Sequence, residues 1–396
     1  MYIVIISAEE EGFMKKMRFI SGCVSIALSV IMLLTGCGEL DSIDEVVLDL
    51  DGTMYDTTDK EKENKEEEIT VAFIFDGLVN DGGYTQMHNN GRIEVEKMSG
   101  VKTIYKENIK DDKDETEKIC EEFIKNGATI IYGTSFGHLE GMAESAKKHP
   151  DIKYIHCSGN ISTNNMSSFF GKIYQMRYLT GIAAGSKTQT NKIGYVAAYP
   201  IPEVIRGINA FAIGARSVNP DVVVEVEWTY TWDNEELERK TAEKLIKNGA
   251  DVIAQHQNTT GAQKAAEAAN IYSIGYNRDM SYANPNQLTS AIWNWGIYYT
   301  ACTQNIIDNK WKSEVEWLDA SSGLVDISPL SEDIDDEIKK LIESEKQNIK
   351  NNKDTIFKGP LYNQNGELMV VDGEIMAEND IYNMDWFIDC VKGSIN

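Results

Sequence analysis

The chain has 396 residues, 42% of them hydrophobic, which is enough for two domains with ordinary hydrophobic cores. Its formal net charge of -25 at pH 7 excludes nucleic acid and anionic bilayers as electrostatic partners, because both are polyanions. A small neutral ligand is compatible with this charge.

The N-terminal segment 1–36 is predicted to be a lipoprotein signal peptide. Basic residues at 15, 16 and 18 precede the uncharged run 19–34, which is short for a membrane span. The run ends in Leu-Thr-Gly-Cys, which resembles the bacterial lipobox and implies that Cys37 is diacylated after cleavage. Two acyl chains would hold the protein on the extracytoplasmic face of the cell membrane. The alternative is an ordinary transmembrane anchor with a chance cysteine.

Residues 1–13 fit no signal design, because three glutamates at 9–11 precede the basic region. We therefore expect translation to begin at Met14 or Met17, and we assign no function to residues 1–13.

Residues 37–68 are predicted to form an acidic tether between the lipid and the folded part. Positions 38 to 68 hold 13 Asp or Glu against 3 Lys, a composition typical of a solvated linker. Within it, residues 46–53 (VVLDLDGT) resemble the first motif of haloacid-dehalogenase phosphatases, which implies a nucleophile at Asp49 and a general acid/base at Asp51. A charged run follows the motif where that fold needs a helix, so a phosphatase is only an alternative.

From residue 69 the pattern changes to short apolar strands that alternate with amphipathic helices, which is typical of a parallel α/β sheet. The strands are predicted at 70–75, 128–132, 153–156, 193–197, 222–226 and 251–254. An internal repeat indicates two similar lobes, because residues 120–131 (CEEFIKNGATII) return as 242–253 (AEKLIKNGADVI). In both copies a helix ends at Asn-Gly, a C-cap preference, and leads into a buried strand.

We therefore predict a two-lobed α/β fold in which each lobe is a parallel sheet flanked by helices, with a ligand cleft between the lobes. The first lobe is predicted to comprise 69–172 plus 293–325, and the second 173–292 plus 326–396. Hinges are expected near 171–174 and 293–295. An amphipathic helix at 334–351 and a hairpin at 357–372 with an Asn-Gly turn are expected to brace a lobe.

The loops that follow the carboxyl ends of the strands form the predicted site, because ligands of open parallel sheets bind there. These loops are 76–85, 134–136, 256–258, 276–279 and 293–296. Aromatic rings that approach from opposite lobes would sandwich a flat ligand, and polar loop residues would supply directed hydrogen bonds. The candidate ligand-binding residues are Asp81, Tyr84, Thr85, Ser135, Phe136, Trp232, Asn258, Asp279 and Trp295, and a second group comprises Asp76, Ser158, Tyr174 and Asn277.

No catalytic residue, metal site or cofactor is predicted. The motifs GxGxxG and Walker A are absent, so no phosphate cradle is evident. The cysteines at 120, 157, 302 and 390 have no CxxC spacing, and the five histidines form no HxxxH or HExxH pair. Reversible binding of a small ligand is therefore favoured over catalysis.

Nine short segments carry a family resemblance. They are DGGYT (81–85), GTSFG (133–137), RYLTG (177–181), PIPEV (200–204) with GIN (207–209), SVNP (217–220), QH (255–256) and NWG (294–296) with YY (298–299). In their order and spacing, from residue 70 to about 386, the chain resembles the basic-membrane-protein (BMP) family of bacterial lipoproteins.

The resemblance implies a periplasmic-binding-protein-like type I fold and a purine receptor that delivers its ligand to an ABC permease after the lobes close about a hinge. It also implies that Tyr84 and Trp232 clasp the base. The GTSFG and NWG segments are closer to the branch that binds free bases such as adenine. Ser158 stands where nucleoside-binding members carry a carboxylate for the ribose, so we favour a base over a nucleoside, although Asp76 and Asp279 are available for a ribose.

Two departures from the family pattern bear on the ligand. Gln175 lies where a Glu is usual and Asn258 where an Asp is usual, and each change replaces a pure acceptor by a mixed donor and acceptor. Such a receptor could prefer an oxo-purine or another ligand. A monomer is expected, and a sensor or regulatory lipoprotein is a further alternative.

Overall fold

The computed structural model describes residues 46–48, 54–56, 68–351 and 353–395, and the chain divides into two compact units at Glu67 and Glu68. In the first unit, strand β1 (Val46–Leu48) pairs antiparallel with β2 (Met54–Asp56). The predicted signal peptide, the predicted lipidation site Cys37, and Asp49 and Asp51 all lie outside the described residues. None of the helices in the described ranges is long and apolar enough to span a bilayer.

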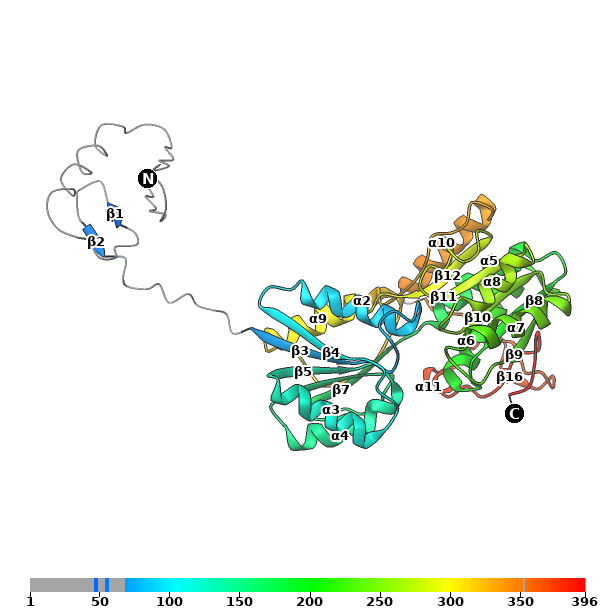
Figure 1. Ribbon diagram of the computed structural model, residues 1–396. Helices are drawn as coiled ribbons and strands as arrows, with labels where there is room; N and C mark the ends of the chain where they lie inside the picture. Colours follow the sequence, from blue (N-terminus) through cyan, green and yellow to red (C-terminus); the bar gives the residue numbers. More distant parts are fainter. Residues whose placement is uncertain (1–45, 49–53, 57–67, 352, 396) are drawn as a thin grey trace, which may run out of the picture. The chain divides into compact units, whose positions relative to one another are not determined.

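In the second unit, the first lobe is built on a sheet with the strand order β13-β7-β6-β5-β3-β4, in which neighbouring strands are all parallel (Figure 1). These strands are β3 (Ile69–Ile74), β4 (Val101–Lys106), β5 (Ala128–Gly133), β6 (Lys153–Cys157), β7 (Met166–Gly171) and β13 (Val315–Leu318). The second lobe repeats this arrangement, with the order β14-β12-β11-β10-β8-β9-β17, and only β14 is antiparallel to its neighbour. Its strands are β8 (Lys192–Ala197), β9 (Val223–Trp228), β10 (Val252–His256), β11 (Tyr272–Asn277), β12 (Gln287–Trp293), β14 (Val325–Ile327) and β17 (Val391–Lys392). The predicted fold class is confirmed.

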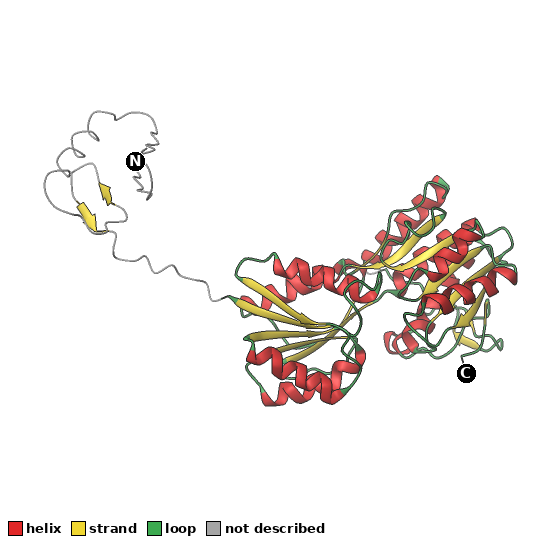
Figure 2. Ribbon diagram, viewed as in Figure 1, coloured by secondary structure: helices red, strands yellow, loops and turns green. Residues whose placement is uncertain are grey.

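Helices cover both faces of each sheet (Figure 2). In the first lobe, α2 (Tyr84–Glu96) and α9 (Trp295–Ile307) lie on one face, and α3 (Lys113–Lys125) and α4 (Leu139–Lys148) lie on the other. In the second lobe, α5 (Tyr174–Lys187), α6 (Pro202–Val218) and α10 (Asp336–Lys350) face α7 (Glu235–Lys247) and α8 (Gly261–Ala268) across the sheet. Alternate residues of a central strand supply the two cores: Val71 and Phe73 pack beneath α2 and α9, whereas Ala72 and Ile74 pack against α3 and α4.

The repeat seen in the sequence is a pair of equivalent helix–strand units. Asp112 caps α3 and Asn234 caps α7, and each side chain accepts a hydrogen bond from a backbone N–H of the first turn. The following glycines, Gly127 and Gly249, have φ values of 86° and 99°, so both helices end in the left-handed residue that an Asn-Gly C-cap predicts.

The chain passes between the lobes at three places in the described residues: from β7 to α5, from β12 to α9, and from β13 to β14. The first two lie where hinges were predicted. The third, through residues 319–324, lies next to the predicted lobe boundary at 325, although no hinge was predicted there. Gln175 braces these crossings, because its amide nitrogen donates to Asp354 at 2.9 Å and its amide oxygen accepts from the backbone N–H of Ala320 at 2.9 Å. The amide therefore uses its donor and its acceptor within the protein.

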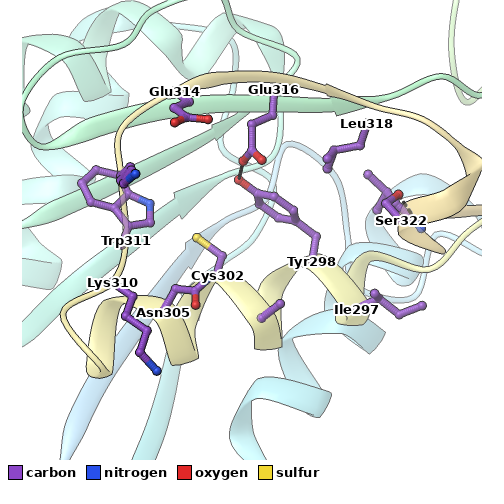
Figure 3. A pocket seen from close by; sticks show the side chains of 13 residues that line it. Ile297, Tyr298, Cys302, Asn305, Lys310, Trp311, Glu314, Glu316, Leu318 and Ser322 are labelled. Carbon is purple, nitrogen blue, oxygen red and sulfur yellow. Dashed lines mark hydrogen bonds between the residues drawn. The ribbon is translucent and has the colours of Figure 1, made fainter.

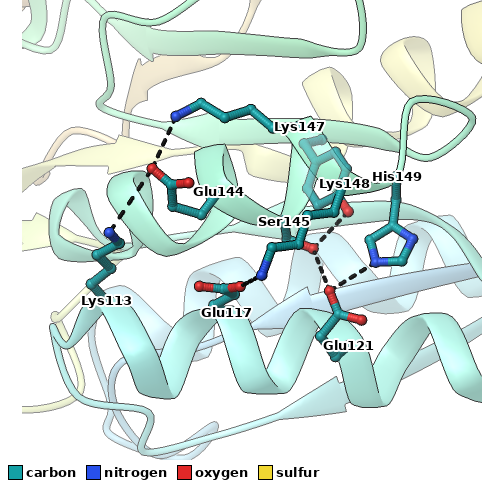
Figure 4. A network of polar contacts seen from close by, with 9 residues as sticks. Lys113, Glu117, Glu121, Glu144, Ser145, Lys147, Lys148 and His149 are labelled. Atoms are coloured by element: carbon teal, nitrogen blue, oxygen red, sulfur yellow. Dashed lines mark hydrogen bonds and ion pairs between the residues drawn. The ribbon is translucent and has the colours of Figure 1, made fainter.

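The outer helices of the first lobe carry a network of exposed polar contacts (Figure 4). Glu144 lies between Lys113 at 3.9 Å and Lys147 at 2.9 Å, and Glu121 accepts from His149 at 2.8 Å. Exposed ion pairs of this kind stabilise by about 0–1 kcal/mol each, so the network contributes little to the fold.

The C-terminal segment braces the second lobe as expected. The predicted amphipathic helix is α10, which buries Ile342 and Ile349. The predicted hairpin is formed by β15 (Leu361–Tyr362) and β16 (Leu368–Val370), which pair antiparallel. Strand β17 then pairs in parallel with β9 and extends the sheet at its edge.

Candidate functional site

The loop after β3 positions an aromatic side chain at the carboxyl edge of the first sheet. Asp81 accepts hydrogen bonds from the backbone N–H groups of Gly83, Thr85 and Gln86, at 2.8 to 2.9 Å. Both carboxylate oxygens are therefore used to hold the first turn of α2, which suits the helix N-terminus. The role of Asp81 in this structure is to fix the direction of Tyr84, which lies within that turn.

Tyr84 belongs to a cluster of stacked rings in the first lobe. It meets His88 edge-on at 4.3 Å and Trp295 edge-on at 5.9 Å, measured between ring centroids. Trp295 is itself stacked between His88 at 4.1 Å and Trp293 at 4.4 Å. Such contacts are worth about 0.5–1.5 kcal/mol each beyond burial, so the cluster is a rigid aromatic wall.

The groups on this wall are held in defined protonation states. The hydroxyl of Tyr84 donates to the carbonyl of Thr134 at 2.9 Å, and the Nδ1 atom of His88 lies 2.6 Å from the hydroxyl of Tyr299. Burial lowers the pKa of His88 well below its ordinary value, so the ring is neutral at pH 7. The Nε1 atom of Trp295 and the Nε2 atom of His88 are buried without a hydrogen-bond partner in the described part of the chain.

The second lobe contributes an aromatic ring and a row of amides. Trp232 lies 6.1 Å from the ring of His256, and its carbonyl accepts from the backbone N–H of Asn258 at 2.8 Å. The amide nitrogen of Asn277 donates to the Oδ1 atom of Asn258 at 3.0 Å. The remaining amide oxygens, Oδ1 of Asn277 and Oε1 of Gln257, are buried and have no partner among the described residues.

The first turn of α2 contacts the second lobe. A Cβ atom at Gly83, at the start of α2, would lie 2.1 Å from the carbonyl oxygen of Asn258 in the second lobe. Arg278 from the second lobe donates to the Oε1 atom of Gln86 in α2 at 2.6 Å. The lobes therefore meet where the predicted ligand-binding loops lie.

The residues after two equivalent strands share an unusual backbone. Ser158 follows β6 with a φ of 66°, and Asn277 ends β11 with a φ of 67°. A left-handed conformation of a residue other than glycine costs about 1 kcal/mol or more, and such residues cluster at ligand sites. The two positions correspond in the two sheets, which supports a site built from both lobes.

Asp76 and Ser158, from the second candidate group, also have partners inside the protein. Asp76 accepts from the hydroxyl of Thr85 at 3.3 Å, and burial raises the pKa of Asp76. Ser158 donates its hydroxyl to the carbonyl of Cys157 at 2.6 Å. The Asp76 carboxylate is therefore partly occupied, and its burial disfavours the charged form.

Four of the predicted residues lie apart from the stacked rings and amides. The hydroxyl of Ser135 donates to Asp111 at 2.6 Å, and Phe136 is 64% exposed. Asp279 is exposed and accepts from Gln287 at 3.1 Å. Tyr174 donates to Asp354 at 2.7 Å beside the hinge. No contact given by the structure joins these four side chains to Tyr84 or Trp232.

Glu203, His256 and Arg177 lie at the carboxyl edge of the second sheet. None of them was selected as a ligand-binding side chain, although all three stand in segments that carry the family resemblance. His256 and Arg177 are completely buried, and the Oε1 atom of Glu203 lies 3.6 Å from the Nε2 atom of His256. One signal could have found Glu203, because it occupies the first turn of the helix after β8, as Tyr84 does after β3.

Two surface hollows lie along α9. One, of about 340 Å³, lies between α9 and the segment 310–324, where Tyr298 donates to Glu316 at 3.0 Å (Figure 3). The other, of about 560 Å³, lies where α2 crosses α9 and includes Met87 and Trp295 in its lining. Of the predicted ligand-binding residues, Trp295 lines the second hollow, whereas Tyr84, Trp232 and Asn258 line neither.

Comparison with known proteins identifies close relatives. The family model of the PnrA-like ABC transporter substrate-binding proteins (Bmp) matches residues 68–360. The purine-binding protein BAB2_0673 of Brucella abortus is 34% identical over 326 residues, which cover 82% of this chain and 93% of that protein. A putative ABC transporter glucose-binding protein of Haloferax volcanii, TsgA13, is 32% identical over 342 residues, which cover 86% of this chain and 84% of that protein.

Solved structures resemble this chain in fold. A solute-binding protein of an ABC transporter system from Conexibacter woesei superimposes with a TM-score of 0.62 and 19% identity, over 72% of this chain and 97% of that one. A transcriptional activator of the comK gene from Bacillus halodurans superimposes with a TM-score of 0.64 and 19% identity, over 70% of this chain and 96% of that one. At this identity the likeness shows the fold alone, and the same fold serves a transporter subunit and a regulator.

Proposed function

Because the chain belongs to the PnrA-like (Bmp) family of ABC transporter substrate-binding proteins, which are extracytoplasmic and are not enzymes, we propose that its ligand is a purine nucleobase such as adenine. The base is bound between the two lobes, and the closed protein delivers it to the permease subunits of an ABC importer. A phosphatase using Asp49 and Asp51 is not part of this account.

The observation that supports the proposal is that the first turn of α2, which carries Tyr84, meets the segment of the second lobe that follows Trp232. Tyr84 rests edge-on against Trp295 in the first lobe, and Trp232 in the second lobe lies next to the amides of Asn258 and Asn277. A flat heterocycle stacks on rings from both sides and exchanges hydrogen bonds with amides around its edge. A relative that is 34% identical is named as a purine-binding protein, which supports the same ligand class for this chain.

A free base suits the site better than a nucleoside. A ribose needs carboxylates that are free to accept from its hydroxyls. Burial disfavours the charged form of Asp76, Asp279 is exposed and lies apart from the stacked rings and amides, and Ser158 has no carboxylate. The nucleoside therefore remains the second candidate within the purines.

A thermal-shift panel tests the ligand class. Adenine, guanine, hypoxanthine, their nucleosides and glucose are each added to the purified protein, because a ligand that binds only the folded state raises its melting temperature. We expect a purine base to give the largest shift, and Trp232→Ala to remove it. Tyr362→Ala, which removes an exposed ring on the distant hairpin, is the control and keeps the shift. A shift from glucose and from none of the purines would replace the proposal by a sugar receptor.

We further propose that Cys37 anchors the protein to the membrane by a lipid. The support is the lipobox-like sequence at 34–37 after a basic and an uncharged run. Mass spectrometry of the N-terminal peptide from membranes is expected to find a diacylated Cys37, and Cys37→Ser to leave an unmodified protein. An intact, unmodified N-terminus in membranes would contradict this anchor.

A further inference from the structure

The carboxylate of Glu203 has the same place in the second lobe as Tyr84 has in the first. Glu203 lies in the first turn of α6, directly after β8, and Tyr84 begins α2, directly after β3. Strands β8 and β3 are equivalent in the two sheets. Because parallel strands present their carboxyl ends at one edge, both first turns face the ligand-binding edge of their lobe.

A buried imidazole lies beside Glu203. The Nε2 atom of His256 is 3.6 Å from the Oε1 atom of Glu203, and no other Lys, Arg or His nitrogen of the described residues is given within 4.0 Å of this carboxylate. Arg177 donates to the carbonyl of Gln255 at 2.7 Å and stacks on Tyr276 at 3.9 Å, while its Nε and Nη2 atoms have no partner in the described chain.

These neighbours keep the carboxylate charged. Burial alone raises the pKa of Glu203, but His256, Arg206 and Arg177 lower it by more, so the net pKa lies below the ordinary value. Burial and the charge of Arg177 lower the pKa of His256 to about 4, so the ring is neutral at pH 7 and can offer an N–H. Glu203 is therefore an ionised acceptor beside a neutral imidazole.

The charge of Glu203 also influences side chains of the first lobe. Burial raises the pKa of Tyr84 well above its ordinary value, and Cys157, Asp76 and Glu203 raise it further through their charges. Burial likewise raises the pKa of Cys157, and Glu203 adds to this effect. The charge of Glu203 therefore acts on two side chains of the first lobe, in keeping with its place at the carboxyl edge of the second sheet.

We propose that Glu203 determines ligand specificity by accepting a hydrogen bond from the exocyclic amine of an aminopurine. This inference rests on the proposed function, since it assigns one contact of the bound base. An ionised carboxylate offers only acceptors, so it attracts an N–H edge and repels a ring carbonyl placed against it. Hydrogen bonds to a charged acceptor are about twice as strong as neutral ones, which makes this contact a discriminating one.

Two pairs of bases measure the contribution of the exocyclic amine to the affinity. Adenine differs from unsubstituted purine by one exocyclic amine, and guanine differs from hypoxanthine in the same way. Titration calorimetry of the intact protein with all four bases gives an affinity ratio for each pair. We expect a ratio of at least tenfold for one pair in the natural protein, and a ratio near one for that pair in Glu203→Met, which keeps the side-chain length and removes the acceptor.

Two further variants separate specificity from folding. Glu203→Gln keeps the shape of the side chain and a neutral acceptor, so it is expected to lower the ratio to an intermediate value. Glu316→Met is the control, because Glu316 is a partly buried carboxylate that accepts from Tyr298 outside the aromatic walls, and it leaves the ratio unchanged. A loss of fold weakens both members of a pair and leaves their ratio intact.

The outcomes distinguish this inference from the proposed function. Binding of purines with a ratio near one in the natural protein, or with the same high ratio in Glu203→Met, would overturn the role of Glu203 while leaving a purine receptor. Absence of binding by all four bases would overturn the proposed function and the role of Glu203 with it.

Discussion

Adding one methyl group at Gly83 is expected to prevent the lobes from closing. A Cβ atom at this position would lie 2.1 Å from the carbonyl oxygen of Asn258 and 2.9 Å from its Cα atom, whereas real Cβ contacts are essentially never shorter than 3.0 Å. The neighbour is backbone of the opposite lobe, so it cannot rotate away as a flexible side chain does. Moving one lobe away from the other removes the overlap without unfolding either.

The expected loss of affinity follows from this overlap. Overpacking that forces a backbone shift costs about 1–3 kcal/mol. Because each 1.4 kcal/mol is a factor of ten, Gly83→Ala should weaken ligand binding roughly 5- to 150-fold. Each lobe keeps its own core, so the melting temperature without ligand should change by less than about 3 °C. Calorimetry and a ligand-free thermal melt measure the two quantities.

A matched glycine provides the control. A Cβ atom at Gly207 in α6 would lie 3.7 Å from Arg177 and from His256, which is ordinary contact, so Gly207→Ala should bind ligand normally. It should also be slightly more stable, since alanine favours a helix over glycine. Unchanged affinity in Gly83→Ala, or an equal loss in both variants, would refute the account of closure.

Three further perturbations have defined outcomes. Burial raises the pKa of Glu238 to about 8 from 4.5, so the folded state holds a proton that the unfolded chain releases, and the free energy of unfolding should fall as pH rises from 4.5 to 8. Glu238→Gln should flatten this slope in denaturant titrations, and an equal slope would contradict the assignment. Gln175→Glu places a second carboxylate 2.9 Å from Asp354 and should lower the free energy of unfolding by about 2 kcal/mol or more. An unchanged melting temperature would contradict this prediction. Arg278→Ala removes the hydrogen bond to Gln86 between the lobes and should weaken ligand binding roughly 5-fold through faster dissociation. An unchanged dissociation rate would show that this hydrogen bond does not hold the lobes together.

Much of the fold could be predicted because local sequence patterns determine its strands and helix ends. The strands predicted at 70–75 and 251–254 are observed within one or two residues, since both are uninterrupted buried apolar runs between helices. The Asn-Gly helix ends were predicted because only glycine adopts their left-handed φ without cost. The internal repeat predicted the second lobe, because the two similar sequences form equivalent helix–strand units.

Other strands were missed because their buried faces are polar. Strand β7 contains Ser167 and Ser168, and the buried hydroxyl of Ser168 donates to the carbonyl of Ile161 at 2.8 Å. Strand β11 contains Ser273 and Gly275, which pack closely against β12. A strand that buries hydroxyl groups and glycine has no apolar alternation to reveal it.

The site was only partly predictable, because its contacts join distant segments. The rule that ligands bind at the carboxyl ends of strands selected the loops of Tyr84 and Asn258, and the structure brings the backbone of these loops together at the junction of the lobes. It could not show that Tyr174 turns toward Asp354 at the hinge. It also could not show that Glu203 meets His256, since 53 positions separate them and no local pattern couples their side chains.

The most direct test of the central claim is calorimetric titration of the purified protein with adenine, and with glucose in parallel. The account predicts a one-to-one complex with adenine of micromolar or higher affinity, lost in Trp232→Ala, and no heat from glucose. Binding of glucose without binding of adenine, guanine or hypoxanthine would contradict the account.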